Sequence, residues 1–239
     1  MVSLRLFRLS ASILFGGVLV SILAGLFHPD REPANTHPAV FAEYAGSDIW
    51  TVVHFGQFIG MVGIIAGLVV MSFALEETES AQGWLNRLAR VAAIVALALY
   101  GVLQAVDGVA LKQAVNAWVA APEADKLIRF SSAEIIRWLE WGARSYQSFM
   151  FGLTLVLFGA VIVLSSRISK PVGYLMGLSG LAYLYQGWII GSEGFSMRNH
   201  MPTLLGIVVI IVWSLWFLIA AWWKAQDAGR PIGPMTTRT

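Results

Sequence analysis

The chain contains no cysteine. This absence excludes disulfides, thiolate metal sites, iron–sulfur clusters and thiol catalysis, so any metal would be bound by histidine, carboxylate or carbonyl groups. Charged residues are also scarce, at 13% of 239 residues, whereas a soluble domain carries about a quarter. The net charge is only +2, and the 16 Lys and Arg residues are scattered singly rather than gathered in a patch, so we expect no nucleic-acid partner.

Long apolar runs take up most of the chain, which is 57% hydrophobic with a mean hydropathy of +0.70. An α-helix needs about 20 apolar residues to cross a hydrocarbon core about 30 Å thick. The sequence therefore predicts an all-α polytopic membrane protein, a single transmembrane domain over residues 1–239 whose partner is the lipid bilayer. We expect a six-transmembrane-helix bundle with spans at about 9–27, 49–75, 91–118, 144–164, 172–191 and 203–223.

Six crossings place both termini on the same side of the membrane. On that side the Lys and Arg residues, among them Arg5, Arg8, Arg87 and Arg90, flank the ends of the expected spans directly. On the other side most basic residues stand beside acidic ones. Because short cytoplasmic loops carry an excess of Lys and Arg, we expect cytoplasmic N- and C-termini.

Two segments on the outer side are longer than simple connections. Residues 28–48 contain Pro29, Pro33 and Pro38, which predicts a loop with one short helical turn at residues 40–44. After the second connection, the capping-box pattern at residues 131–134 predicts a fourth helix that runs from about Ser132 to Leu164. Since this helix exceeds the bilayer thickness, we expect an extended outer hairpin with the third helix, which ends before Pro122.

Glycines recur at intervals of three and four residues on the second and fifth expected spans. Such stripes allow two helix backbones to approach closely, and bundle packing is the interpretation we favour. The residues are Gly56, Gly60, Gly63 and Gly67 on one helix, and Gly173, Gly177 and Gly180 on the other.

Polar side chains within the expected spans gather at one depth, in the outer half of the membrane. Ionisable groups inside a span are candidates for function because lipid tolerates them poorly. The candidate residues are His54, Gln57, Gln104, Asp107, Glu140, Arg144, Gln147 and Gln186. We expect Asp107 and Arg144 to pair directly, and the inner half to carry nothing more polar than Ser, Thr or Tyr. A closed ion-pair network that sets helix register and a pocket that receives a ligand both remain open.

The four histidines, His28, His37, His54 and His200, all fall at or near the outer face. A haem with two imidazole ligands would need His54 and His200. A zinc or copper site would draw on His28, His37 and His54 with Asp48 or Glu43, although these lack the tight spacing of a helical metal motif. Ordinary interfacial histidines are the simpler interpretation, and the sequence leaves the cofactor unknown.

One stretch of the chain resembles a known group of proteins. Residues 167–175, Arg-Ile-Ser-Lys-Pro-Val-Gly-Tyr-Leu, are followed by Gly-Leu-Ser-Gly-Leu at residues 177–181. This run resembles the loop and fifth helix of small, uncharacterised bacterial integral membrane proteins grouped as a domain of unknown function. The resemblance implies a compact six-helix domain of a bacterial inner membrane, and it implies no catalytic residue.

The sequence carries no nucleotide-binding glycine fingerprint, no Walker loop, no Gly-x-Ser-x-Gly elbow and no His-Glu-x-x-His motif. Three hypotheses therefore remain. The first is a protein that binds a small amphipathic ligand or cofactor in an outer-half pocket. The second is a membrane-embedded enzyme that uses Asp107, Glu140 or His54 as acid or base, with Arg144 as an electrostatic clamp. The third is an accessory subunit of a membrane complex or a small carrier.

Overall fold

The computed structural model describes residues 2–29 and 31–227, and within these ranges the chain forms helices and connections but no β-strand. Five helical segments are long and apolar enough to cross a membrane. The helices are α1 (Val2–Gly25), α2 (His37–Ala45), α3 (Trp50–Ala74), α4 (Ala81–Ala105), the π-helix η1 (Val106–Leu111), α5 (Lys112–Val119), the 3-10 turn η2 (Glu123–Asp125), α6 (Lys126–Leu164), α7 (Lys170–Glu193), the 3-10 turn η3 (Met197–Asn199) and α8 (His200–Asp227).

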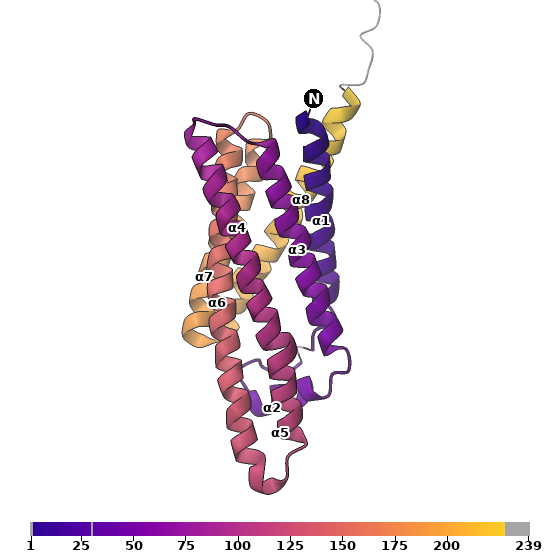
Figure 1. Ribbon diagram of the computed structural model, residues 1–239, viewed down its shortest axis with the longest axis vertical. Helices are drawn as coiled ribbons and strands as arrows, with labels where there is room; N and C mark the ends of the chain where they lie inside the picture. Colours follow the sequence, from indigo (N-terminus) through magenta and orange to yellow (C-terminus); the bar gives the residue numbers. More distant parts are fainter. Residues whose placement is uncertain (1, 30, 228–239) are drawn as a thin grey trace, which may run out of the picture.

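The long helices run up and down through one bundle (Figure 1). One group pairs α1 with α3, and a second group packs α4, α6 and α7 together. Helix α8 links the two groups, because it begins beside α7 and ends beside α1. The N-terminus and the far end of α8 consequently lie at the same end of the molecule, which we call the inner end (Figure 1).

At the opposite, outer end, two long helices extend beyond the others (Figure 1). Helix α4 continues through η1 into α5 as one segment of 39 residues, and α6 also has 39 residues. At 1.5 Å per residue each is about 58 Å long, nearly twice the thickness of a hydrocarbon core. Helix α2 packs against α5, so the loop between α1 and α3 lies over the same end of the bundle.

One expected helix start was wrong, and another helix is longer than the span predicted within it. The helix that holds the third expected span, 91–118, begins at Ala81, because the Ser80 hydroxyl accepts a hydrogen bond from the Gly83 amide (3.1 Å) and caps it. The fourth begins at Lys126 rather than Ser132. The Ser132 hydroxyl donates to the Ile128 carbonyl within the helix, so it does not act as a cap.

The predicted role of the glycines in helix packing is confirmed for six of the seven, whereas a Cβ atom on Gly177 would meet nothing within 4 Å. A Cβ atom on Gly60 would stand 2.6 Å from the Ser21 backbone of α1, and one on Gly173 would stand 2.7 Å from the Gly159 carbonyl of α6. Both separations are too short for any side chain. The α1–α3 and α6–α7 pairs therefore depend on glycine for their close backbone approach.

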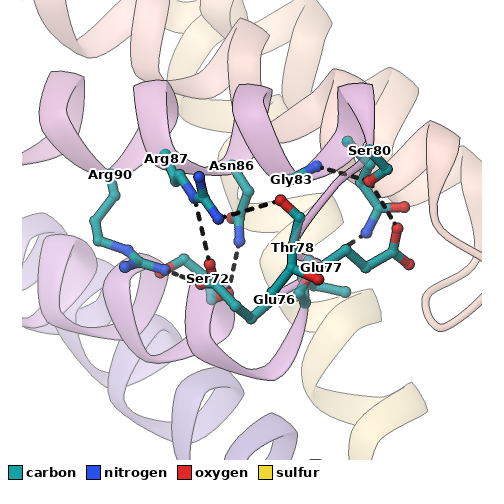
Figure 2. Close-up of polar contacts among 11 residues, drawn as sticks. Ser72, Glu76, Glu77, Thr78, Ser80, Gly83, Asn86, Arg87 and Arg90 are labelled. Carbon is teal, nitrogen blue, oxygen red and sulfur yellow. Dashed lines mark hydrogen bonds and ion pairs between the residues drawn. The ribbon is translucent and has the colours of Figure 1, made fainter.

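A network of polar side chains joins α3 to α4 at the inner end (Figure 2). Asn86, which is fully buried, donates to the Ser72 carbonyl (2.7 Å), and Arg90 Nε donates to the Ser72 hydroxyl (2.8 Å). Arg90 also forms an ion pair with Glu76. Asn86 and Arg90 stand just before the third expected span, 91–118, and they belong to the helix because α4 already begins at Ala81.

Candidate functional site

A cavity of about 680 Å³ lies in the outer half of the bundle, between the α1–α3 pair and the other long helices. Seven of the eight residues singled out in the sequence line it: Gln57, Gln104, Asp107, Glu140, Arg144, Gln147 and Gln186. The eighth, His54, lies against Asp107. The walls come from more helices than expected, because residues of α1 and α8 also border the cavity.

Arg144 and Gln147 face this cavity from α6 without a partner among the residues that the structure describes. Arg144 is half-buried, and among the described residues its guanidinium makes no hydrogen bond and no ion pair within 4 Å. Gln147 is 1% exposed, yet neither its amide nitrogen nor its amide oxygen has a hydrogen-bond partner in the part of the chain that the structure describes. A buried amide without partners is costly, so the cavity offers groups that water or a ligand would satisfy.

Gln186, by contrast, is fully engaged. Its amide oxygen accepts from the Ser148 hydroxyl (3.0 Å), and its amide nitrogen donates to the Thr203 hydroxyl (2.6 Å). Thr203 in turn donates to the Asn199 carbonyl (2.7 Å). This chain of hydrogen bonds ties α6, α7 and the start of α8 together, and it makes Gln186 a structural part of the cavity wall.

Asp107 lies in the π-helix η1, which interrupts the regular ladder of backbone hydrogen bonds. Its backbone carbonyl accepts a hydrogen bond from Trp50 Nε1 of α3 (3.1 Å). The next residue, Gly108, faces His54, where an added Cβ would stand 2.8 Å from the His54 Cβ. The π-helix and the missing side chain thus bring α3 and η1 together at this point.

The expected pair of Asp107 and Arg144 was wrong. Asp107 Oδ2 instead lies 3.1 Å from His54 Nε2, and His54 Nδ1 lies 2.8 Å from the Trp50 carbonyl. Both side chains are largely buried, with 15% and 3% of their surfaces exposed. Because Gly108 lets the imidazole pack against the turn that carries Asp107, His54 and not Arg144 reaches the carboxylate.

The other buried carboxylate, Glu140, pairs with Arg137 one turn earlier on α6 (2.6 Å). Arg137 is 2% exposed and also donates to the Ala34 carbonyl (3.2 Å) and the Tyr44 hydroxyl (3.4 Å). Arg137 therefore links α6 by hydrogen bonds to the outer loop, through Ala34, and to α2, through Tyr44. The sequence analysis missed this role, although the spacing of three residues between Arg137 and Glu140 is the signal that predicts such a pair on a helix.

The structure brings together a different pair of histidines from the one considered for a haem. His54 lies beside His28, with ring centroids 5.2 Å apart, while His200 begins α8. The His37 Nδ1 atom lies 2.9 Å from a carboxylate oxygen of Glu134 in α6, and the His37 ring stacks on Phe41. Among the described residues, the ligand atoms that gather within 4.8 Å of one another belong to His28, His54 and Asp107.

Comparisons with known proteins add no relative to this description. No protein family, no curated protein and no solved structure matches the chain.

Proposed function

We propose that this protein binds a small amphipathic ligand with an anionic group in the outer-half cavity. The observation that carries the proposal is a pair of side chains, Arg144 and Gln147, that line a cavity of about 680 Å³ and have no partner in residues 2–29 and 31–227. Known ligand pockets have volumes of about 300–1,000 Å³ and combine apolar walls with a few polar groups. A guanidinium next to a free amide suits a carboxylate, sulfate or phosphate group.

The apolar part of such a ligand would lie between α1 and α8. These two helices contact each other near the inner end, where Phe7 meets Phe217 edge to face and Trp222 Nε1 donates to the Ser12 hydroxyl (3.3 Å). Further out they border the cavity with apolar residues instead, Ile22 of α1 and Leu204 and Ile207 of α8. Leu204 is 58% exposed, so this side of the cavity adjoins the surface that lipid would cover. An amphipathic molecule could therefore pass between bilayer and cavity.

We further propose that α7 crosses the membrane as a sixth span, although it is less apolar than the five long segments. Helix α6 ends at the inner end and α8 starts near the outer side of the bundle (Figure 1). The intervening helix, α7, packs against α6 from Gly187 beside Ser145 to Gly173 beside Gly159. These positions are 14 residues apart on α7, about 21 Å along the helix, which is most of a hydrocarbon core. The chain would also fit the bacterial six-helix domain that residues 167–181 resemble.

The orientation in this proposal follows the basic residues. Four basic residues lie at the inner end: Arg87 and Arg90 in the first turns of α4, Arg167 between α6 and α7, and Lys170 at the start of α7. We therefore assign that end to the cytoplasm of a bacterial cell, and both termini with it. The α5–α6 hairpin then projects outside the inner membrane, and the cavity faces the outer leaflet.

The experiment uses a long-chain fatty acid as the probe, with the corresponding fatty alcohol as its neutral match. Thermal unfolding of the full-length protein in detergent is followed with and without each probe. We expect the fatty acid to raise the midpoint temperature of unfolding by several degrees, because a ligand that binds only the folded state stabilises that state. The alcohol is expected to have a smaller effect because it lacks the anionic group.

Arg144→Gln should abolish the difference between acid and alcohol, and Gln147→Leu should reduce it. Arg198→Gln is the matched control, since Arg198 is an exposed arginine at the outer end that pairs with Glu193 (2.6 Å) and does not line the cavity. An acid-specific shift that survives in Arg144→Gln, or that disappears in Arg198→Gln as well, would contradict the proposal.

A membrane-embedded enzyme is a second candidate, favoured by one observation. Asp107 lines the cavity, its Oδ2 lies beside the His54 imidazole, and its Oδ1 has no hydrogen-bond partner among the described residues. A carboxylate in this position could accept a proton from a bound molecule. An enzyme would convert an added amphiphile, which mass spectrometry of wild type and Asp107→Asn after incubation would reveal, whereas a binding protein would return it unchanged.

A further inference from the structure

His28, His54 and Asp107 meet at the wall of the cavity although they come from three separate parts of the chain. His28 follows α1, His54 lies in the first turns of α3, and Asp107 lies in η1. One ligand atom from each lies within 4.8 Å of the other two. We infer that these three side chains form a binding site for one divalent transition-metal ion, a site separate from the Arg144 group proposed to hold the amphiphile.

The contact between His54 and Asp107 is the first argument. Nε2 and Oδ2 are 3.1 Å apart, yet the geometry makes no hydrogen bond, and Nε2 has none with any other described residue. His54 Nδ1, 2.8 Å from the Trp50 carbonyl, must carry a proton to be bound there. In a neutral imidazole, Nε2 then presents a lone pair to a carboxylate oxygen, and two such acceptors repel each other unless a cation lies between them.

The distances suit an ion in that position. Zinc binds histidine nitrogen at about 2.0–2.1 Å and carboxylate oxygen at about 2.0–2.2 Å, which separates two tetrahedral ligands by about 3.4 Å. The observed 3.1 Å between Nε2 and Oδ2 is close to this value. The His28 ring is tilted by 58° to the His54 ring, and all three ligand atoms already lie within 4.8 Å of one another. A shift of at most about 1.4 Å would bring the His28 ligand atom to the separation of two zinc ligands.

Hydrogen bonds with a neighbouring residue hold two of the three candidate ligands in place, as is typical of metal sites. Metal-bound histidines typically donate their second ring N–H to a carbonyl or carboxylate, and here His54 Nδ1 has the Trp50 carbonyl. The indole N–H of the same tryptophan holds the backbone of Asp107 (3.1 Å). Trp50 is 1% exposed, so one buried residue contacts both ligands, His54 through its backbone carbonyl and Asp107 through its indole N–H.

The types of the three ligand atoms limit which metal ion the site would bind. Two imidazoles and one carboxylate, without any thiolate, suit zinc or ferrous iron rather than calcium or magnesium. Three protein ligands leave at least one coordination position open, as in catalytic rather than structural sites. His28 and Asp107 both line the cavity, so the open position would face it.

The test measures Zn²⁺ binding to the full-length protein after treatment with a chelator and return to metal-free buffer. We expect one Zn²⁺ per chain by elemental analysis after gel filtration, and a visible absorption band of tetrahedral or five-coordinate Co²⁺ when cobalt replaces zinc. His28→Ala and Asp107→Asn should each weaken Zn²⁺ binding at least tenfold, because loss of even an outer-shell partner costs about 10–100-fold. His28 is half-buried and lies outside the helices, so its replacement should leave the fold intact.

His200→Ala is the matched control, because His200 borders the same cavity but does not belong to the cluster. It should bind Zn²⁺ as the wild type does. The inference is overturned if the wild type binds no Zn²⁺, in which case the His54–Asp107 contact is an imidazolium–carboxylate pair. It is equally overturned if His28→Ala and Asp107→Asn bind the ion with unchanged affinity. Circular dichroism of each variant identifies any that has lost its helices.

Discussion

Trp50 holds Asp107 by its backbone, because the indole N–H of α3 donates to the carbonyl oxygen in the π-helix (3.1 Å). A π-helix leaves backbone groups without their usual partners, and it persists where tertiary contacts satisfy them. Trp50 also accepts from His54 through its own carbonyl (2.8 Å). One residue thus orients both members of the His54–Asp107 pair. Asp107 lines the cavity, so the π-helix that carries it lies at the cavity wall.

The first prediction concerns Gly108 in that π-helix. Gly108→Ala should destabilise the protein by about 1–3 kcal/mol, because the new methyl group would stand 2.8 Å from the His54 Cβ and force the two helices apart. Thermal or denaturant unfolding in detergent measures the effect. The control is Gly142→Ala in α6, where no atom lies within 4 Å of the added Cβ, and where a small gain in stability is expected. Equal effects at the two glycines would refute the contact.

The second prediction concerns the buried pair of Arg137 and Glu140. Glu140→Gln or Arg137→Met alone should cost about 3–5 kcal/mol, because each leaves a buried charge without its partner. The double variant should cost less than the sum of the two, since the unpaired charge is removed as well. A double-mutant cycle from unfolding midpoints gives the coupling energy, and additive losses would show that the two groups do not interact.

The third prediction compares two neighbouring glycines of α1. A Cβ on Gly17 would lie 2.5 Å from the Ile64 amide nitrogen and 2.6 Å from the Gly60 carbonyl oxygen of α3, whereas a Cβ on Gly16 meets nothing within 4 Å. Gly17→Ala should therefore lower stability by about 1–3 kcal/mol or more, because backbone cannot move aside as a side chain can. Gly16→Ala should leave the unfolding midpoint unchanged or slightly raised. Similar midpoints for both variants would argue against the α1–α3 contact.

The fourth prediction tests the orientation, and the absence of cysteine makes the test simple. A single cysteine at Ala124, exposed in the outer turn between α5 and α6, should react with a membrane-impermeant maleimide on intact spheroplasts. A single cysteine at Ser166, exposed in the inner connection between α6 and α7, should react only after the membrane is broken. The reverse pattern would place both termini outside the cytoplasm.

The sequence by itself determined the helical class, the approximate place of each long helix and the depth of the polar residues. These properties are local, since a hydrophobic run predicts a helix and the 1.5 Å rise per residue gives the depth of His54, Asp107 or Gln186 along it. The same reasoning located helix ends less well, because Ser80 and Lys126 start their helices through caps and connections that hydropathy does not reveal.

Only the tertiary structure decided which polar groups meet. Depth restricts a side chain to one layer of the bundle but leaves open the rotation of each helix and its neighbours, so Asp107 had several candidate partners at one level. Gly108 and the π-helix bring His54 to Asp107, and Arg137 pairs with Glu140. Neither carboxylate therefore pairs with Arg144, which lines the cavity. The cavity itself depends on the path of α8, which contacts α1 near the inner end and α7 near its start. A crossing of two helices is set by packing across the whole bundle, and no single stretch of sequence encodes it.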